Sequence, residues 1–307
     1  MVMKMLKIYI DGQAGTTGLA LEERLLELGN SAEIEILKIA EDLRKDVVER
    51  KRLLNLADVV FLCLPDEAAK ESVMLVENPN TVIIDASTAH RTNPDWVYGF
   101  PELSSAQYEK LTTSHKIAVP GCHATGFIAL VYPLMQAGVI KATDQLYCHS
   151  LTGYSGGGKQ MIAEYEGHDD ESADVKAIKS AAWMYAMDLD HKHLPEMTAL
   201  TGLAKNPLFV PVVVPIHKGM IVHVPLAMDA KLLHEVLSGY YKESETIEVM
   251  EFGKVNSLNI ENDIPADGLE IYVFGDEFQA VVTARFDNLG KGSSGAAVQC
   301  MKVRFGL

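Results

Sequence analysis

The chain has 307 residues, of which 48% are hydrophobic and 22% charged, so it can form two globular domains and is too apolar for a disordered protein. Its formal net charge of −15 argues against general binding to nucleic acids or anionic membranes, but not against a small phosphorylated substrate. No apolar run approaches the roughly 18 residues of a membrane-spanning helix. With four scattered cysteines and no recognisable signal peptide, a cytoplasmic location is expected.

Up to about residue 120, apolar strands alternate with helices. A short strand leads into a glycine loop and a helix with apolar residues at helical spacing, and two later strands are apolar on both faces. This alternation predicts an α/β fold, a Rossmann-like doubly wound parallel sheet. Strands are expected at 7–10, 33–39, 57–65 and 81–87, and helices at 19–28 and about 41–54.

The first glycine loop has the spacing of a dinucleotide-binding fingerprint. Gly12, Gly15 and Gly18 follow the first strand and open the first helix, where backbone N–H groups can approach a pyrophosphate. Thr16 and Thr17 add hydroxyl donors. A turn without a ligand is the alternative, but the strand before and the helix after favour phosphate binding.

Charged residues after the second strand leave the choice between NAD and NADP open. Glu41 or Asp42 can hold a ribose 2′-hydroxyl. Lys38, Arg44 or Lys45 can instead hold a 2′-phosphate.

Two later strand ends are expected to border the cofactor, because ligands of open α/β sheets lie beyond the carboxyl ends of the strands. Leu64 and Pro65 end one of these strands, and Ser87 ends the other. Capping of a turn is an equally good interpretation of Ser87.

The pattern changes after residue 121. Strand-like segments with few intervening helices predict an α+β domain with a mixed or antiparallel sheet, suited to catalysis and dimerisation. We therefore expect a cofactor domain at 1–121, completed by a C-terminal helix at 287–307, and a catalytic domain at 122–286. The strand-like segments lie at 145–151, 208–214, 220–228, 247–252, 270–274 and 279–286.

Cys122 is the strongest candidate nucleophile. It follows Pro-Gly and precedes an apolar run with helical spacing, which puts its sulfur at a helix N-terminus, where the thiolate is favoured over the thiol. A structural cysteine in a strand-to-helix turn is the alternative. Cys63, Cys148 and Cys300 lie in apolar segments and read as small buried hydrophobes.

A second candidate site lies at 191–196, in the order His-Lys-His-Leu-Pro-Glu. His191 or His193 can act as a general acid or base, with Glu196 as a carboxylate partner. A solvated surface patch is one alternative. Zinc is a weaker one, because no third ligand is obvious in the sequence, and no metal is predicted.

Two turns can bind an anion. The segment 151–159 offers several backbone N–H groups and Lys159, and His217 and Lys218 form a cationic turn between two strands. Both turns can equally be loops without a ligand.

Six motifs taken together resemble N-acetyl-gamma-glutamyl-phosphate reductase, in its shorter variety, over nearly the whole chain. Each motif is weak alone, but six in this order are highly specific. They are GxxGTTG at 12–18, DASTAHR at 85–91, YGFPEL at 98–103, PGC at 120–122, SGGGK at 155–159 and HKHxPE at 191–196.

The resemblance implies an NADPH-dependent reduction of N-acetylglutamyl 5-phosphate to the 5-semialdehyde in arginine biosynthesis, with release of phosphate. It assigns the nucleophile to Cys122 and the acid/base to the histidine pair, of which we favour His193, held by Glu196. It implies a homodimer or homotetramer. Together, the residue patterns and the resemblance give as expected cofactor-binding residues Gly12, Gly15, Thr16, Thr17, Gly18, Arg44, Leu64, Pro65, Ser87, Gly156, Gly157 and Asn288. The expected substrate-binding residues are Arg91, Ser155 and Lys159, with His217 and Lys218 added from their cationic turn, where the chain departs from the family.

Other interpretations remain open at this point. Aspartate-semialdehyde dehydrogenase and the aminoadipate-pathway reductase share the chemistry, and a cofactor-binding regulator without catalysis would share the fold. The resemblance is least close at His217 and Lys218, and the segment 164–187 before the histidine pair reads as an extra element without an assigned role.

Overall fold

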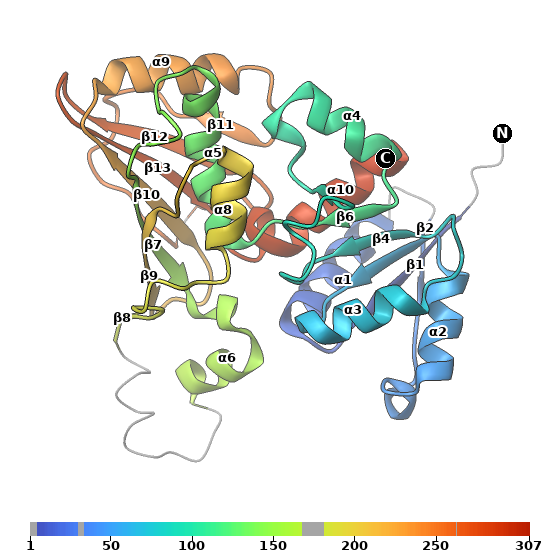
Figure 1. Ribbon diagram of the computed structural model, residues 1–307. Coiled ribbons are helices and arrows are strands. Elements are labelled where there is room, and N and C mark those ends of the chain that lie inside the picture. The colour runs from blue at the N-terminus through green and yellow to red at the C-terminus, as the bar shows by residue number, and fades with distance from the viewer. Residues whose placement is uncertain (1–4, 30–33, 168–180, 262) are drawn as a thin grey trace. The chain divides into compact units, whose positions relative to one another are not determined.

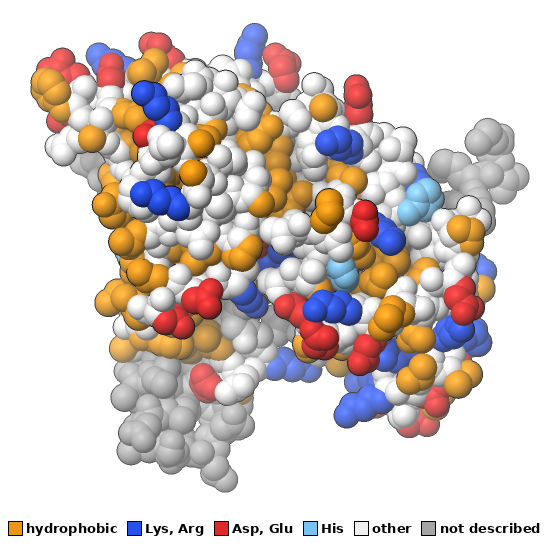
Figure 2. Space-filling model, in the orientation of Figure 1, with side chains coloured by type: hydrophobic (Ala, Val, Ile, Leu, Met, Phe, Trp, Pro, Cys, Tyr) orange, Lys and Arg blue, Asp and Glu red, His pale blue; other side chains and the backbone are white. Residues whose placement is uncertain are grey.

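The computed structural model describes residues 5–29, 34–167, 181–261 and 263–307 (Figure 1). The chain forms two compact units, an N-terminal unit of residues up to Pro120 with Ser293–Leu307, and a second unit of Gly121–Gly292. Among these residues, no helix is both long and apolar enough to cross a membrane. On the face drawn in Figure 2, acidic and basic side chains are interspersed.

Six described strands form the sheet of the N-terminal unit, and every neighbouring pair is parallel. Every residue of β3 and of β4 is buried, as expected for central strands with helices on both faces. In spatial order the strands are β2 (Ile34–Leu37), β1 (Leu6–Asp11), β3 (Val59–Leu62), β4 (Val82–Asp85), β6 (Lys116–Ala118) and β5 (Val97–Tyr98).

Helices pack on both faces of this sheet and form two apolar clusters. α1 and α10 contribute Leu21, Leu25 and Met301 to one cluster, and α2 and α3 contribute Leu53 and Ala69 to the other. This arrangement confirms the predicted doubly wound fold. The helices are α1 (Thr16–Gly29), α2 (Val47–Leu56), α3 (Asp66–Leu75), α4 (Ser105–Thr113) and α10 (Gly295–Phe305), with short turns η1 (Glu41–Leu43) and η2 (Pro101–Leu103). A further short turn, η4 (Gly290–Ser294), contains the boundary between the two units.

The single charged helix expected at about 41–54 is wrong. The structure has the short turn η1, then a break, and then α2 from Val47 to Leu56. α2 begins here because Asp46 is its N-cap residue. The side chain of Asp46 accepts a hydrogen bond from the backbone N–H of Glu49.

The second unit contains a sheet of seven described strands, which is mixed as expected. Its parallel pairs are β11 with β12 and β7 with β9, and the other neighbours are antiparallel. In spatial order the strands are β11 (Ile247–Val249), β12 (Leu269–Gly275), β13 (Ala280–Phe286), β10 (Met220–Leu226), β7 (Tyr147–Gly153), β9 (Leu208–Val214) and β8 (Trp183–Met184).

The long helix of this unit, α5 (Cys122–Gln136), is buried along most of its length. It packs against β10 and β13 of the sheet and against two further helices, α8 and α9. Burial on all sides fixes the position of its first residue, Cys122. The other helices are α6 (Gly158–Glu166), α8 (Leu194–Thr201) and α9 (Ala230–Tyr240), and a short turn η3 (Tyr154–Gly157) precedes α6.

Acid is expected to weaken the second unit through His223 on β10. Burial, and then the neighbouring His149, lower the pKa of His223 to about 4. In the unfolded chain this histidine binds a proton near pH 6.5. The stability contributed by neutral His223 is therefore present above pH 6.5 and is lost as the pH falls towards 4. Between pH 7 and pH 5, the free energy of unfolding measured in urea is therefore expected to fall less for His223→Gln than for the parent. Equal decreases in the two proteins would contradict this.

Candidate active site and cofactor pocket

Cys122 is the first residue of α5, and Gly121 before it is the N-cap residue. The thiol is half-buried. A Cβ atom at position 292 would lie 2.9 Å from the Cβ of Cys122, so glycine at this position leaves space beside Cys122. The N–H groups of a first helical turn have no partner within the helix, and together with the helix dipole they favour a thiolate and can bind an oxyanion.

Two histidines, His123 and His193, lie beside this thiol, and a third, His191, lies against both of them. His191 and His193 precede α8, and His123 is the second residue of α5. All three are buried, with ring centroids 5.4 Å apart for His123 and His191, 5.4 Å for His123 and His193, and 4.7 Å for His191 and His193. Cys122 Sγ, a His123 nitrogen and a His193 nitrogen all lie within 4.8 Å of one another. The structure thus brings together two motifs that are about 70 residues apart in the chain.

Hydrogen bonds hold the backbone around the histidine pair. The backbone N–H of His193 donates to Nδ1 of His191 at 3.1 Å, so His191 carries its proton on Nε2 when neutral. Glu196 is 1% exposed and accepts a hydrogen bond from the backbone N–H of Gly121 at 3.1 Å. Glu196 therefore ties α8 to the residue directly before Cys122, a positioning contact that the sequence does not predict.

Two hydroxyl groups hold the ring of His123, one at each nitrogen. Its Nε2 lies 2.8 Å from the hydroxyl of Tyr185 and its Nδ1 lies 2.8 Å from Oγ of Ser150. Burial, followed by the charges of His191 and Lys192, holds the pKa of His123 well below its usual value, so the ring is neutral at pH 7. Burial and then the charge of Cys122 raise the pKa of Tyr185, which therefore remains a neutral phenol near Cys122.

Asn288, Ser155 and Gly156 meet at one point of the second unit. Asn288 accepts a hydrogen bond from the backbone N–H of Gly219 at 2.8 Å and donates one to Oγ of Ser155 at 2.9 Å. A Cβ at Gly156 would approach Nδ2 of Asn288 to 3.4 Å. Because Asn288 and Ser155 are buried, this amide fixes the loop after β13 against the turn after β7.

The remaining predicted anion-binding residues lie nearer the surface. His217 is exposed, with Nδ1 3.3 Å from a carboxylate oxygen of Glu166, and Lys218 forms an ion pair of 3.6 Å with Asp287. Gly157 and Lys159 are also exposed. The carboxylates beside His217 and Lys218 reduce the positive charge that this turn offers to an anion.

The glycine loop of the N-terminal unit has the backbone shape that a phosphate cradle needs. Gly12 has φ +93°, and a Cβ there would lie 2.2 Å from the carbonyl oxygen of Cys63, so only glycine fits. A Cβ at Gly18 would lie 2.5 Å from the carbonyl oxygen of Gly12. Thr16 is the first residue of α1, and its buried hydroxyl has no hydrogen-bond partner among the described residues. This hydroxyl and the helix N-terminus fit a pyrophosphate.

A cavity of about 390 Å³ lies beside this loop within the N-terminal unit. Its lining brings together the glycine loop, the residues after β2 and the end of β3. Of the alternatives after the second strand, Arg44 and Lys45 line the cavity, and Arg44 also forms an ion pair of 3.2 Å with Glu41. Lys38 is not a lining residue and is paired with Glu22. The lining consists of Tyr9, Ile10, Asp11, Gly12, Gln13, Ala14, Gly15, Ile39, Arg44, Lys45, Arg50, Cys63, Leu64 and Ala68.

Arg50 is a lining residue that the sequence does not single out. Its guanidinium donates to both carboxylate oxygens of Asp11, at 3.3 and 2.9 Å, and to Oγ of Ser72 at 2.6 Å. The side chains of Arg50 and Asp11 are 12% and 5% exposed, so this is a buried ion pair at the end of β1.

Arg50→Leu is expected to destabilise the protein by about 3–5 kcal/mol, because it leaves the carboxylate of Asp11 buried without its cation. Guanidinium chloride unfolding of the variant measures this loss. The double variant Arg50→Leu, Asp11→Asn is the matched control and is expected to recover much of it, since no charge is then left buried. A double variant no more stable than Arg50→Leu would contradict this account of the pair.

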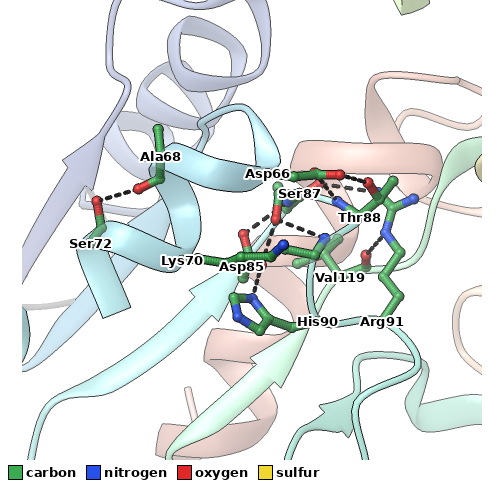
Figure 3. A network of polar contacts seen from close by, with 12 residues as sticks. Asp66, Ala68, Lys70, Ser72, Asp85, Ser87, Thr88, His90, Arg91 and Val119 are labelled. Atoms are coloured by element: carbon green, nitrogen blue, oxygen red, sulfur yellow. Dashed lines mark hydrogen bonds and ion pairs between the residues drawn. The ribbon is translucent and has the colours of Figure 1, made fainter. Parts of the chain in front are cut away.

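The ends of β4 and β6 form a second polar network (Figure 3). Asp85 accepts hydrogen bonds from the side chain of Ser87 at 2.7 Å and lies 2.6 Å from Nδ1 of His90. Arg91 donates hydrogen bonds to the carbonyl oxygens of Val119 at 2.9 Å and of Ala86 at 3.0 Å. Val119 lies three residues before Cys122 in the chain. Ser87 and Arg91 thus both make contacts within the protein that hold these strand ends.

Leu64 and Pro65 lie at the start of α3, with Leu64 in the cavity wall and Pro65 exposed as the N-cap residue.

The extra segment 164–187 is described only in part, because residues 168–180 lie outside the described residues. Its described C-terminal end supplies Tyr185, which contacts His123.

Two models of the semialdehyde dehydrogenase family match the chain. The model described as the NAD binding domain matches residues 7–111, and the model described as the dimerisation domain matches residues 122–288. N-acetyl-gamma-glutamyl-phosphate reductase 2 of Nostoc sp. is 39% identical and covers 98% of this chain and 97% of its own. The N-acetyl-gamma-glutamyl-phosphate reductase of Brucella ovis is 42% identical, over 98% of this chain and 99% of its own.

Solved structures with a similar fold are aspartate semialdehyde dehydrogenases. Aspartate semialdehyde dehydrogenase II of Vibrio cholerae, complexed with ASA, has a TM-score of 0.73 at 16% identity and covers 98% of each chain. The enzyme of Candida albicans with NADP has a TM-score of 0.65 at 14% identity, again over 98% of each chain. At these identities the likeness concerns the fold alone.

Proposed function

Because this chain belongs to the N-acetyl-gamma-glutamyl-phosphate reductase family, we propose that it reduces N-acetylglutamyl 5-phosphate to N-acetylglutamate 5-semialdehyde with NADPH and releases phosphate. The observation that carries this proposal is the half-buried Cys122 at the N-terminus of a buried helix, with a nitrogen of His193 within 4.8 Å of its sulfur. A thiolate in this position suits an acyl phosphate, which carries a good leaving group.

The first step is acyl transfer to the protein. The thiolate of Cys122 attacks the acyl carbon, the C–O bond to phosphate breaks, and a thioester forms on Cys122. The N–H groups of the first turn of α5 stabilise the oxyanion of the tetrahedral intermediate. Glu196 keeps this turn in place through the backbone N–H of Gly121.

The second step is reduction of the thioester. NADPH, held at the glycine loop of the N-terminal unit, would supply the hydride for the acyl carbon. The same N–H groups stabilise the oxyanion of the resulting thiohemiacetal, which collapses to the aldehyde as the C–S bond breaks. His193 donates a proton to the departing sulfur of Cys122, and His191 supports the backbone of His193.

Arg44 and Lys45 are the residues we propose for binding the 2′-phosphate that distinguishes NADPH from NADH, because both line the cavity beside the glycine loop. Arg44→Ala is expected to raise the KM for NADPH by about 10-fold or more, since a charge-assisted hydrogen bond is lost, and to leave the KM for NADH nearly unchanged. Steady-state kinetics with both cofactors measure this. Lys38→Ala is the matched control, because Lys38 does not line this cavity. Equal changes for NADPH and NADH in Arg44→Ala would contradict the assignment.

The proposed reaction is tested in reverse, as phosphate-dependent reduction of NADP followed at the nicotinamide absorbance. N-acetylglutamate semialdehyde is expected to be turned over, with no activity when phosphate is omitted. Turnover of aspartate semialdehyde or an N-modified aminoadipate semialdehyde in its place would keep the mechanism and change the substrate. Cofactor binding without turnover of any of the three would favour a non-catalytic role.

Self-association is part of the proposal, because the second unit matches a dimerisation domain. We propose a homodimer or a homotetramer. Sedimentation equilibrium is expected to give two or four times the mass of the chain, and a monomer at micromolar concentration would contradict this.

A further inference from the structure

Three side chains at the start of α5 and before α8 form a compact group of metal-binding atoms. They are the sulfur of Cys122, a ring nitrogen of His123 and a ring nitrogen of His193, all within 4.8 Å of one another. The two histidines are buried and the cysteine is half-buried, so the sulfur is partly exposed to solvent. The sequence identifies only the pair His191 and His193, because nothing in the chain order shows that His123 joins them.

We propose that Cys122, His123 and His193 form a binding site for a divalent cation of borderline softness, with Zn²⁺ as the first candidate. One thiolate and two imidazoles are ligands that Zn²⁺ prefers, whereas Mg²⁺ and Ca²⁺ prefer oxygen. Three protein ligands leave a fourth tetrahedral position for water or another small ligand.

The site needs only a small contraction to hold the ion. Zn–S and Zn–N bonds of roughly 2.3 and 2.0 Å place tetrahedral ligand atoms about 3.5 Å apart, so separations of up to 4.8 Å close by about 1 Å. His123 exchanges one of its two hydrogen bonds, to Tyr185 or to Ser150, for the metal bond. The hydrogen bond that remains orients the ring, as outer partners of metal-bound histidines do.

Zinc binding would block catalysis. The thiol of Cys122 loses its proton to solvent and its sulfur donates an electron pair to the metal, so it cannot attack an acyl carbon. No electron is transferred, and a chelator therefore reverses the process. This inhibition rests on the proposed function, but the metal site itself does not.

Anaerobic titration of the chelator-treated full chain with Co²⁺ tests the site without any assay of activity. A thiolate bound to Co²⁺ gives a sulfur-to-metal charge-transfer band in the near ultraviolet, and one equivalent per chain is expected to saturate it. The band is expected to disappear in Cys122→Ser. Absence of the band in the parent, or an unchanged band in Cys122→Ser, would overturn the proposal.

Zn²⁺ affinity, measured by competition against a chromophoric chelator, tests the two histidines. His123→Asn and His193→Asn are each expected to weaken binding by about 10- to 100-fold or more. His149→Gln is the matched control, because His149 is an exposed histidine on β7. Circular dichroism checks that each variant is folded. If one of them does not fold, the other still tests its own histidine. Unchanged Zn²⁺ affinity in either folded variant would overturn its assignment as a ligand.

A separate assay addresses inhibition. Zn²⁺ is expected to inhibit the parent reversibly, in competition with the acyl phosphate and not with NADPH. If Co²⁺ binds as described but the chain turns over no semialdehyde, the proposed function fails and the metal site stands. If turnover is found but no charge-transfer band, the metal site fails and the proposed function stands.

Discussion

Cys122→Ser is expected to lower turnover by roughly 10⁴-fold or more, because a serine hydroxyl at the same position is not ionised at neutral pH and cannot form the thioester. Binding of NADPH is expected to be unchanged, since the cavity beside the glycine loop does not include residue 122. Single-turnover kinetics and a fluorescence titration with NADPH measure the two effects on the same preparation.

The matched control is Cys148→Ala, which removes a thiol from β7. Burial raises the pKa of Cys148, so this thiol is neither accessible nor ionised at neutral pH. Alkylation by iodoacetamide is expected to inactivate the parent and Cys148→Ala at equal rates. Substantial turnover by Cys122→Ser, or loss of NADPH binding in it, would count against the assignment of the nucleophile.

His193→Gln is the second substitution with a large expected effect. Loss of a positioned proton donor typically lowers turnover by about 10²- to 10⁴-fold, and glutamine keeps a similar volume without a titrating group. The limb of the pH–rate profile that depends on this proton is expected to flatten. Measurement of kcat against pH in parent and variant tests both effects.

His191→Gln distinguishes the two histidines of the pair. Nδ1 of His191 accepts the backbone N–H of His193, so its replacement is expected to disturb the position of the donor but to keep the pH limb. The opposite result, with the limb lost in His191→Gln and kept in His193→Gln, would transfer the acid/base role to His191.

The sequence predicts those features that depend on local order. The apolar runs at β3 and β4 identify a parallel sheet because both faces of a central strand are buried. Gly12 and Gly18 mark the glycine loop, where close backbone contacts exclude a side chain. Six motifs in one order identify the family, and the curated relatives confirm this prediction.

The contacts that complete the site depend on segments far apart in the chain. Tyr185 meets His123 across 62 positions, and Glu196 meets Gly121 across 75. The sequence predicts that Arg50 is a surface residue of a charged helix, but in the structure it forms a buried ion pair with Asp11. Nothing in the local pattern distinguishes these residues from solvated ones, because their role arises only when the two segments pack together.

Trapping of the acyl-enzyme tests the central claim most directly. The protein is mixed with N-acetylglutamyl phosphate in the absence of NADPH, quenched in acid, digested and analysed by mass spectrometry. The account predicts an N-acetylglutamyl adduct on the peptide that contains Cys122, which disappears when NADPH is included before the quench. An adduct on another residue, or full turnover without any adduct on Cys122, would contradict the thioester mechanism.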